Sequence, residues 1–170
     1  MVESRDHESL GKEVVFILLY LVQHAEAKKE EEDPERGLTD KGFRDIARSA
    51  VYAQKLGVRV SAIYHSGKKR AGQTAQVLAD YLKPEKGATK TDNLAPLDDP
   101  AAWSKRISEM SEDILLVGHL PYLAKLAGLL LCGDKEKMFV DFRMAGIVCL
   151  KRSDDGRWAL QWMIAPEMTV

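Results

Sequence analysis

Two histidines, His24 and His119, each come at the end of an apolar run. His24 follows the apolar run 14–22 and Gln23, and His119 follows residues 114–117 and a glycine. Continuous apolar runs of this length are typical of strands that are buried on both faces of a parallel sheet. Ligands of such sheets bind outside the carboxyl ends of the strands. We therefore expect both imidazoles to face one pocket at that edge.

These residue types suit the transfer of a phosphoryl group. A neutral imidazole is a competent nucleophile at neutral pH because its ordinary pKa is ~6.5. A second, protonated imidazole neutralises charge on the transferring group. Arg36 and Arg70 add planar guanidinium groups that match phosphate oxygens. Arg70 also falls in the first turn of a predicted helix, where free N–H groups favour an anion. The set favours a phosphohistidine intermediate that needs no metal.

The elements that must position these residues follow from periodicity and from turn residues. The sequence predicts strands at 14–23, 62–66, 91–96 and 114–118, and helices at 40–57, 68–82, 100–110 and 121–131. Thr39 is the expected N-cap of the first helix. Residues 146–152 and 157–164 flank an Asp-Gly pair and read as a terminal antiparallel hairpin. Strands that alternate with helices predict an α/β fold with right-handed crossovers.

Composition narrows the class of protein. We expect one domain over residues 13–170, preceded by a polar lead-in at residues 1–12. The net charge of −1 gives no indication of a nucleic-acid or membrane partner. No apolar stretch reaches the ~20 residues that cross a bilayer, and no signal peptide is visible, so we expect a cytoplasmic protein. Cys132 and Cys149 lack metal-ligand spacing and are expected to be buried free thiols.

Four short motifs in order carry a family resemblance. They are Leu-Val-Gln-His-Ala-Glu at 21–26, Gly-Leu-Thr at 37–39, Ser-x3-Arg-Ala-x-Gln-Thr at 66–74 and Gly-His-Leu-Pro at 118–121. Together they resemble the histidine phosphatase superfamily, and within it the SixA-like phosphohistidine phosphatases, over residues 14–164. The resemblance implies a three-layer α/β/α fold with a mostly parallel sheet, like that of phosphoglycerate mutase. It implies His24 as the phosphorylated nucleophile, Arg70 and His119 as phosphate-binding cations, Arg36 near the phosphate, and no metal or other cofactor.

The first motif departs from the family pattern. The usual Arg-His-Gly is replaced by Gln23-His24-Ala25. A glutamine donates a neutral hydrogen bond, which stabilises a phosphate less than a charged one. Either Arg36 or one of the lysines supplies the missing charge, or the chain is a phosphate-binding module of low turnover. The candidate lysines are Lys28, Lys68 and Lys69.

The proton donor is a second open point. Relatives that cleave phosphate esters carry a carboxylic acid in an insertion, which is short here and offers Asp98 or Asp99. The same residues suit the N-cap of the helix at Pro100. Because imidazole leaves more readily than an alkoxide, the short loop favours a phosphohistidine substrate. We expect this group on a phosphocarrier or HPt-like phosphorelay protein, with a small phosphorylated metabolite as the alternative, and a monomer or weak dimer.

Overall fold

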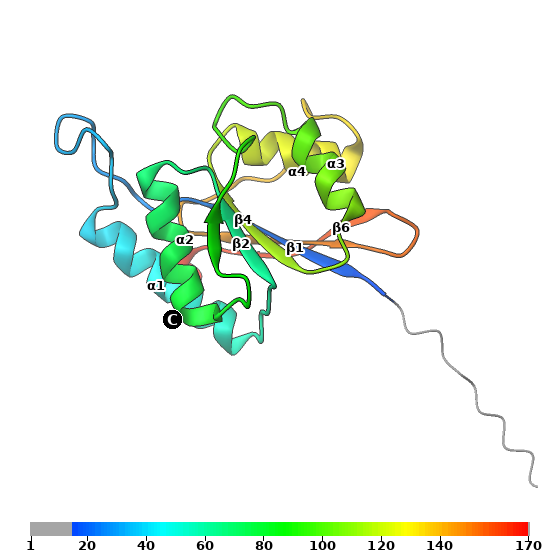
Figure 1. Cartoon of the computed structure of the whole chain (residues 1–170), viewed down its shortest axis with the longest axis horizontal. Helices are drawn as coiled ribbons and strands as arrows, with labels where there is room; N and C mark the ends of the chain where they lie inside the picture. The colour runs from blue at the N-terminus through cyan, green and yellow to red at the C-terminus, as the bar shows by residue number, and fades with distance from the viewer. Residues whose placement is uncertain (1–14, 170) are drawn as a thin grey trace, which may run out of the picture.

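A six-stranded sheet forms the centre of the computed structural model, which describes residues 15–169 (Figure 1). The predicted lead-in at residues 1–12 lies outside the described residues. The strand order is β3-β2-β4-β1-β5-β6, and the first four strands are mutually parallel. β5 runs antiparallel to both β1 and β6. The mostly parallel sheet and its terminal antiparallel hairpin agree with the prediction.

The strands and helices have the following bounds. The strands are β1 Ile17–Gln23, β2 Ala62–His65, β3 Ala88–Lys90, β4 Ile114–Gly118, β5 Ile147–Arg152 and β6 Trp158–Ile164. The helices are α1 Asp40–Lys55, α2 Lys69–Leu82, α3 Ala101–Glu109, α4 Tyr122–Cys132 and the 3-10 turn η1 Pro166–Met168.

Helices cover both faces of the sheet, which gives three layers (Figure 1). Alternate residues of β1 point to opposite faces. Tyr20 and Val22 pack with buried residues of α1 and α2, whereas Leu19 and Leu21 pack with those of α3 and α4. Because both faces of β1 are buried, its sequence is continuously apolar rather than alternating. The same reason explains why the periodicity predicted a parallel sheet.

The start of α1 is fixed against the segment that follows β1. Thr39 is the N-cap, and its hydroxyl accepts a hydrogen bond from the amide of Gly42 at 2.9 Å. The same hydroxyl donates to the carboxylate of Glu26 at 2.8 Å. A Cβ on Gly42 would lie 2.2 Å from the carbonyl oxygen of Glu26, so only glycine permits this close approach. The chain just beyond His24 is therefore held by the first turn of a helix.

Three sequence predictions are wrong in detail. The edge strand is β3 at Ala88–Lys90, not residues 91–96, because Asn93 turns into the left-handed region at φ 63°. The first strand begins at Ile17 and not at residue 14, and Val15 and Phe16 are exposed. Cys132 is exposed, while Cys149 is buried as expected.

Among the described residues, none of the helices is both long enough and apolar enough to cross a membrane.

Candidate active site

His24 and His119 lie side by side at the carboxyl edge of the sheet. β1 and β4 are adjacent parallel strands, and their last residues, Gln23 and Gly118, are paired. The amide of His24 extends this ladder by donating to the carbonyl of Gly118 at 3.0 Å. The centroids of the two imidazole rings are 5.1 Å apart. Residues almost a hundred positions apart in the chain thus share one site.

The hydrogen bonds of His24 indicate which ring nitrogen is free. Its Nδ1 lies 2.7 Å from the carbonyl oxygen of Ala25, and its Nε2 lies 3.3 Å from Nε of Arg70. A carbonyl only accepts and a guanidinium only donates, so the proton resides on Nδ1 and the lone pair on Nε2. The pKa of His24 is lowered to about 4, chiefly by burial; the hydrogen bond to the Ala25 carbonyl opposes this shift, and the charges of Arg70 and Arg36 add to it. At neutral pH the ring is therefore neutral and presents a nucleophilic nitrogen.

His119 is almost fully buried and is also neutral. Its Nε2 lies 2.6 Å from the hydroxyl of Ser66, and its Nδ1 is buried without a hydrogen-bond partner among the described residues. Burial is the largest cause that lowers the pKa of His119 to about 3, followed by the charges of His24, Arg70 and Lys68. The sequence-based expectation of a protonated second imidazole is thus not met in the free site. A phosphate dianion beside the ring would raise this pKa, because opposite charge favours the protonated form.

α2 positions both the guanidinium and the backbone next to His24. Arg70 and Thr74 are four residues apart and lie on one side of the helix. The hydroxyl of Thr74 accepts a hydrogen bond from the amide of Ala25 at 3.0 Å and donates to the carbonyl of Arg70 at 2.7 Å. Thr74 therefore connects the helix that carries Arg70 to the residue that follows His24.

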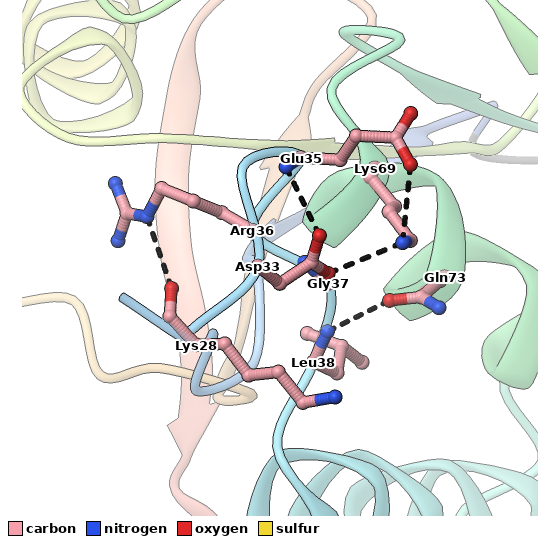
Figure 2. Close-up of polar contacts among 8 residues, drawn as sticks. All are labelled: Lys28, Asp33, Glu35, Arg36, Gly37, Leu38, Lys69 and Gln73. Atoms are coloured by element: carbon pink, nitrogen blue, oxygen red, sulfur yellow. Dashed lines mark hydrogen bonds and ion pairs between the residues drawn. The ribbon is translucent and has the colours of Figure 1, made fainter. Parts of the chain in front are cut away.

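Arg36 reaches the site from the loop that joins β1 to α1. Its Nε donates to the carbonyl of Lys28 at 3.1 Å, as Figure 2 shows. Its positive charge lowers the pKa values of His24, Arg70 and His119, so it lies within electrostatic range of all three. A groove of about 430 Å³ runs beside Arg36 and Arg70. Its lining residues are Glu30, Pro34, Glu35, Arg36, Lys68, Lys69 and Arg70.

The structure distinguishes the candidate replacements for the missing arginine. The side-chain oxygen of Gln23 is buried with no hydrogen-bond partner among the described residues. Lys69 is bound to the carboxylates of Asp33 and Glu35 at 3.1 Å and 3.3 Å, so its charge is neutralised locally. The positive charge of Lys68 contributes to the lowered pKa of His119. Arg36 and Lys68 therefore have their charge available to the site, whereas Lys69 does not.

The two aspartates considered as acids both have backbone partners. Asp99 accepts a hydrogen bond from the amide of Ala101 at 3.1 Å, at the first residue of α3. Asp98 accepts from the amide of Ala95 at 2.8 Å. Burial, and then the charges of Asp98 and Asp99, raise the pKa of Tyr122, in the first turn of α4. Pro100 is the N-cap of α3, so neither aspartate occupies the predicted N-cap position, although Asp99 accepts the amide hydrogen of the first helical residue.

The sequence analysis missed three side chains that hold the site together. Ser66 bonds His119, Thr74 bonds the chain beside His24, and Gln73 accepts the amide hydrogen of Leu38 at 2.7 Å. All three belong to the Ser-x3-Arg-Ala-x-Gln-Thr motif, so the signal was present. Their partners depend on tertiary contacts that the motif alone does not specify. Among the described residues there is no group of three or more metal-ligating side chains.

Comparison with known proteins agrees with this geometry. The profile described as the histidine phosphatase superfamily (branch 1) matches residues 19–98, which include His24, Arg36 and Arg70. The predicted resemblance to this superfamily is confirmed. No curated protein shows significant sequence similarity to the chain.

Solved structures of two phosphatases and a phosphoglycerate mutase share the fold. The protein histidine phosphatase SixA, complexed with tungstate, has a TM-score of 0.79 at 22% identity, over 89% of this chain and 98% of that one. A phosphoserine phosphatase from Entamoeba histolytica, in complex with 3-phosphoglyceric acid, has a TM-score of 0.66 at 17% identity, over 91% of this chain and 100% of that one. A phosphoglycerate mutase from Plasmodium falciparum has a TM-score of 0.64 at 18% identity, over 87% of this chain and 90% of that one. The fold class is thus as predicted.

Proposed function

We propose that this chain is a metal-independent phosphatase of the histidine phosphatase superfamily that works through a phosphohistidine on His24. The observation that carries the proposal is the tautomer of His24: its Nε2 lone pair faces Arg70 while Nδ1 is held by Ala25. This pattern leaves Nε2 unprotonated beside a guanidinium that can shift its hydrogen bond to a phosphate oxygen.

The reaction follows from the arrangement of these groups. Nε2 of His24 attacks the phosphorus atom, and the bond from phosphorus to the leaving group breaks. Arg70, Arg36 and Lys68 balance the negative charge, and His119 takes up a proton as that charge approaches. Water then attacks phospho-His24, which releases inorganic phosphate and restores the neutral ring.

The substrate that we propose is phosphohistidine on a phosphocarrier or HPt-like phosphorelay protein in the cytoplasm. A phosphoimidazole that is protonated on its other ring nitrogen leaves as neutral imidazole, so the protein needs no acid for this step. An alkoxide leaving group would need one, and Asp98 and Asp99 already accept backbone hydrogen bonds. The superfamily fold and its likeness to SixA support this choice.

A small phosphorylated metabolite is the second candidate. The supporting observation is that a phosphoserine phosphatase shares the fold at a TM-score of 0.66. The groove beside Arg70 also combines glutamates with lysines, which suits a ligand that carries both charges.

Rapid-quench trapping tests both parts of the proposal. The chain is mixed with a ³²P-phosphohistidine phosphocarrier protein, and separately with phosphoserine, and the protein-bound label is tested for acid lability. We expect acid-labile label on the wild-type chain from the phosphocarrier, and none on His24→Ala. Faster turnover of phosphoserine would favour the metabolite alternative. Tungstate binding without turnover of either substrate would favour the phosphate-binding module.

A further inference from the structure

Arg36 lies on the loop between β1 and α1 at a backbone position that favours glycine. The backbone of Arg36 adopts a left-handed conformation at φ 53°, which residues other than glycine rarely adopt. The loop runs between Ala27 and Leu38, which form an isolated antiparallel bridge outside the sheet, and the amide of Lys28 closes its base by donating to the carbonyl of Gly37 at 2.8 Å. Contacts beyond this base also hold the loop around Arg36.

Asp33 organises the backbone on both sides of Arg36. Its carboxylate accepts hydrogen bonds from the amides of Glu35 at 3.1 Å and Gly37 at 2.9 Å. Its backbone carbonyl accepts from the amide of Arg36 itself at 2.8 Å. Three consecutive amides are therefore held by one residue. The Gly37 amide and then Lys69 hold the pKa of Asp33 below its usual value, so the carboxylate stays charged.

Lys69 connects this loop to α2. Its ammonium group bonds Asp33 and Glu35 together, and Figure 2 shows it between the two carboxylates. The side chain of Lys69 is 37% exposed and that of Asp33 18%, so the pair is shielded more than a free surface pair. Gln73, one helical turn further along, accepts the amide of Leu38 at the end of the loop. Lys69 and Gln73 thus both bind the loop to the helix, and we call this pair of residues the latch.

Helical spacing separates this latch from the catalytic contacts. Lys69 and Gln73 are four residues apart, as are Arg70 and Thr74. Since neighbours at this spacing share a helix face, one face of α2 holds the Arg36 loop and the next holds the segment at His24. The helix therefore sets the distance between the two arginines that would bind phosphate.

We propose that Lys69 is a positioning residue that acts through Asp33 and Glu35 to hold Arg36 at the phosphate site. The inference rests on the proposed function. Although Lys69 lies between two cationic neighbours in the sequence, it binds the loop and not the phosphate.

A double-mutant cycle with Arg36 tests the latch. The chain is titrated with tungstate by calorimetry, and KM and kcat are measured with a small aryl phosphate. We expect Lys69→Met to weaken tungstate binding and raise KM about fivefold, the upper range for a partly exposed ion pair, with little change in kcat. In the Arg36→Ala background the same change should have no further effect, because a residue that acts through Arg36 is then redundant. Lys69→Arg should restore most of the affinity.

Lys41→Met is the matched control, because it removes an exposed ion pair with Asp45 on α1. Equal affinities for Lys69→Met and Lys41→Met would overturn the latch. The latch would also be overturned if Lys69→Met weakened tungstate binding equally in the wild-type and the Arg36→Ala backgrounds, since Lys69 would then contact the anion directly.

Hydrogen exchange reports on the latch independently of catalysis. Lys69→Met should speed exchange at the amides of Glu35, Gly37 and Leu38, and Lys41→Met should not. Unchanged exchange there would overturn the latch even if the enzyme proves active. If the wild-type chain neither binds tungstate nor hydrolyses phosphate while exchange responds as expected, the proposed function fails and the contact itself stands.

Discussion

His24 is distinguished from the other described histidines by its protonation and its neighbours. Its ring is neutral because of burial, and its free nitrogen is aimed by Ala25 and Arg70. His65 also has a lowered pKa from burial, but its Nδ1 accepts the amide of Gly67. A low pKa alone thus does not mark the nucleophile; the lone pair of His24 faces the guanidinium of Arg70, whereas the Nδ1 lone pair of His65 faces a backbone amide.

Replacing His24 with glutamine should abolish the phosphoenzyme and turnover while the fold persists. Glutamine keeps polar atoms near Ala25 and Arg70 but cannot carry the phosphoryl group. Residual turnover is measured with an aryl phosphate, and folding by thermal melting. His119→Ala and Arg70→Ala should slow turnover by roughly 10²-fold, the usual cost of one transition-state donor. A His24→Gln variant that still forms acid-labile phosphoprotein would refute the assignment.

Gln23→Arg should not raise activity, because Arg36 and Lys68 already bring charge to the site. The paired change Arg36→Ala should weaken phosphate binding by about tenfold, near the lower end of a lost charged hydrogen bond of about 1.5–3 kcal/mol. Binding is measured by tungstate titration, with Arg44→Ala on the exposed side of α1 as control. If Arg36→Ala binds as wild type and Gln23→Arg gains affinity, the site is one charge short and the low-turnover module is favoured.

At the scale of elements, α2 is the part that brings the site together. Its first two turns contact the Arg36 loop through Lys69 and Gln73, and the segment after β1 through Thr74. The sequence predicted this helix and its start to within one residue. It did not predict which loops the helix would hold, because those contacts depend on the loop conformation around Asp33.

Thr74→Val should misplace His24 with little change in packing volume. Valine has nearly the shape of threonine but leaves the buried amide of Ala25 without an acceptor, which costs about 1–3 kcal/mol. We expect a lower melting temperature and a lower kcat. Thr89→Val on the exposed edge strand β3 is the control, and it should be close to neutral. If the two variants have the same kcat, the Thr74 hydroxyl does not position the nucleophile.

At the scale of the whole molecule, the sheet order joins residues that are distant in the chain. β1 and β4 are neighbours, so His24 meets His119 across 95 positions of sequence, and β2 directs Ser66 to the same edge. Buried parallel strands have a recognisable apolar pattern, which is why the fold and the strand-end histidines could be predicted. The ionisation of His119 could not, because it depends on burial that only the packed structure defines.

Chelators should leave the proposed activity unchanged, since the groups nearest the site are cations. Arg36, Arg70 and Lys68 repel a divalent metal, and the acids beside them, Asp33 and Glu35, are paired with Lys69. Turnover of an aryl phosphate is measured after dialysis against EDTA and compared with an untreated sample. Inhibition that added Mg²⁺ or Zn²⁺ reverses would contradict a metal-independent mechanism.

The two neutral histidines should make the folded protein sensitive to mild acid. The native pKa values of about 4 for His24 and about 3 for His119 lie below the ordinary value near 6.5. Between its native pKa and about 6.5, each histidine binds a proton in the unfolded chain but not in the native chain. The free energy of unfolding therefore falls as the pH falls below about 6.5. The slope is at most about 1.4 kcal/mol per pH unit for each histidine, and it levels off near pH 4 for His24.

Urea denaturation between pH 7.5 and 4.5 measures this dependence in the wild type, His24→Gln and His119→Gln. In each variant, the slope of the free energy of unfolding against pH should be smaller by the contribution of one histidine, whatever the stability of the variant at pH 7.5. Saturating phosphate should also flatten the curve, because a bound anion raises both pKa values and lets the native site take up protons. A wild-type slope that neither variant nor phosphate reduces would mean that other groups control the acid response and that the two rings are not buried as neutral imidazoles.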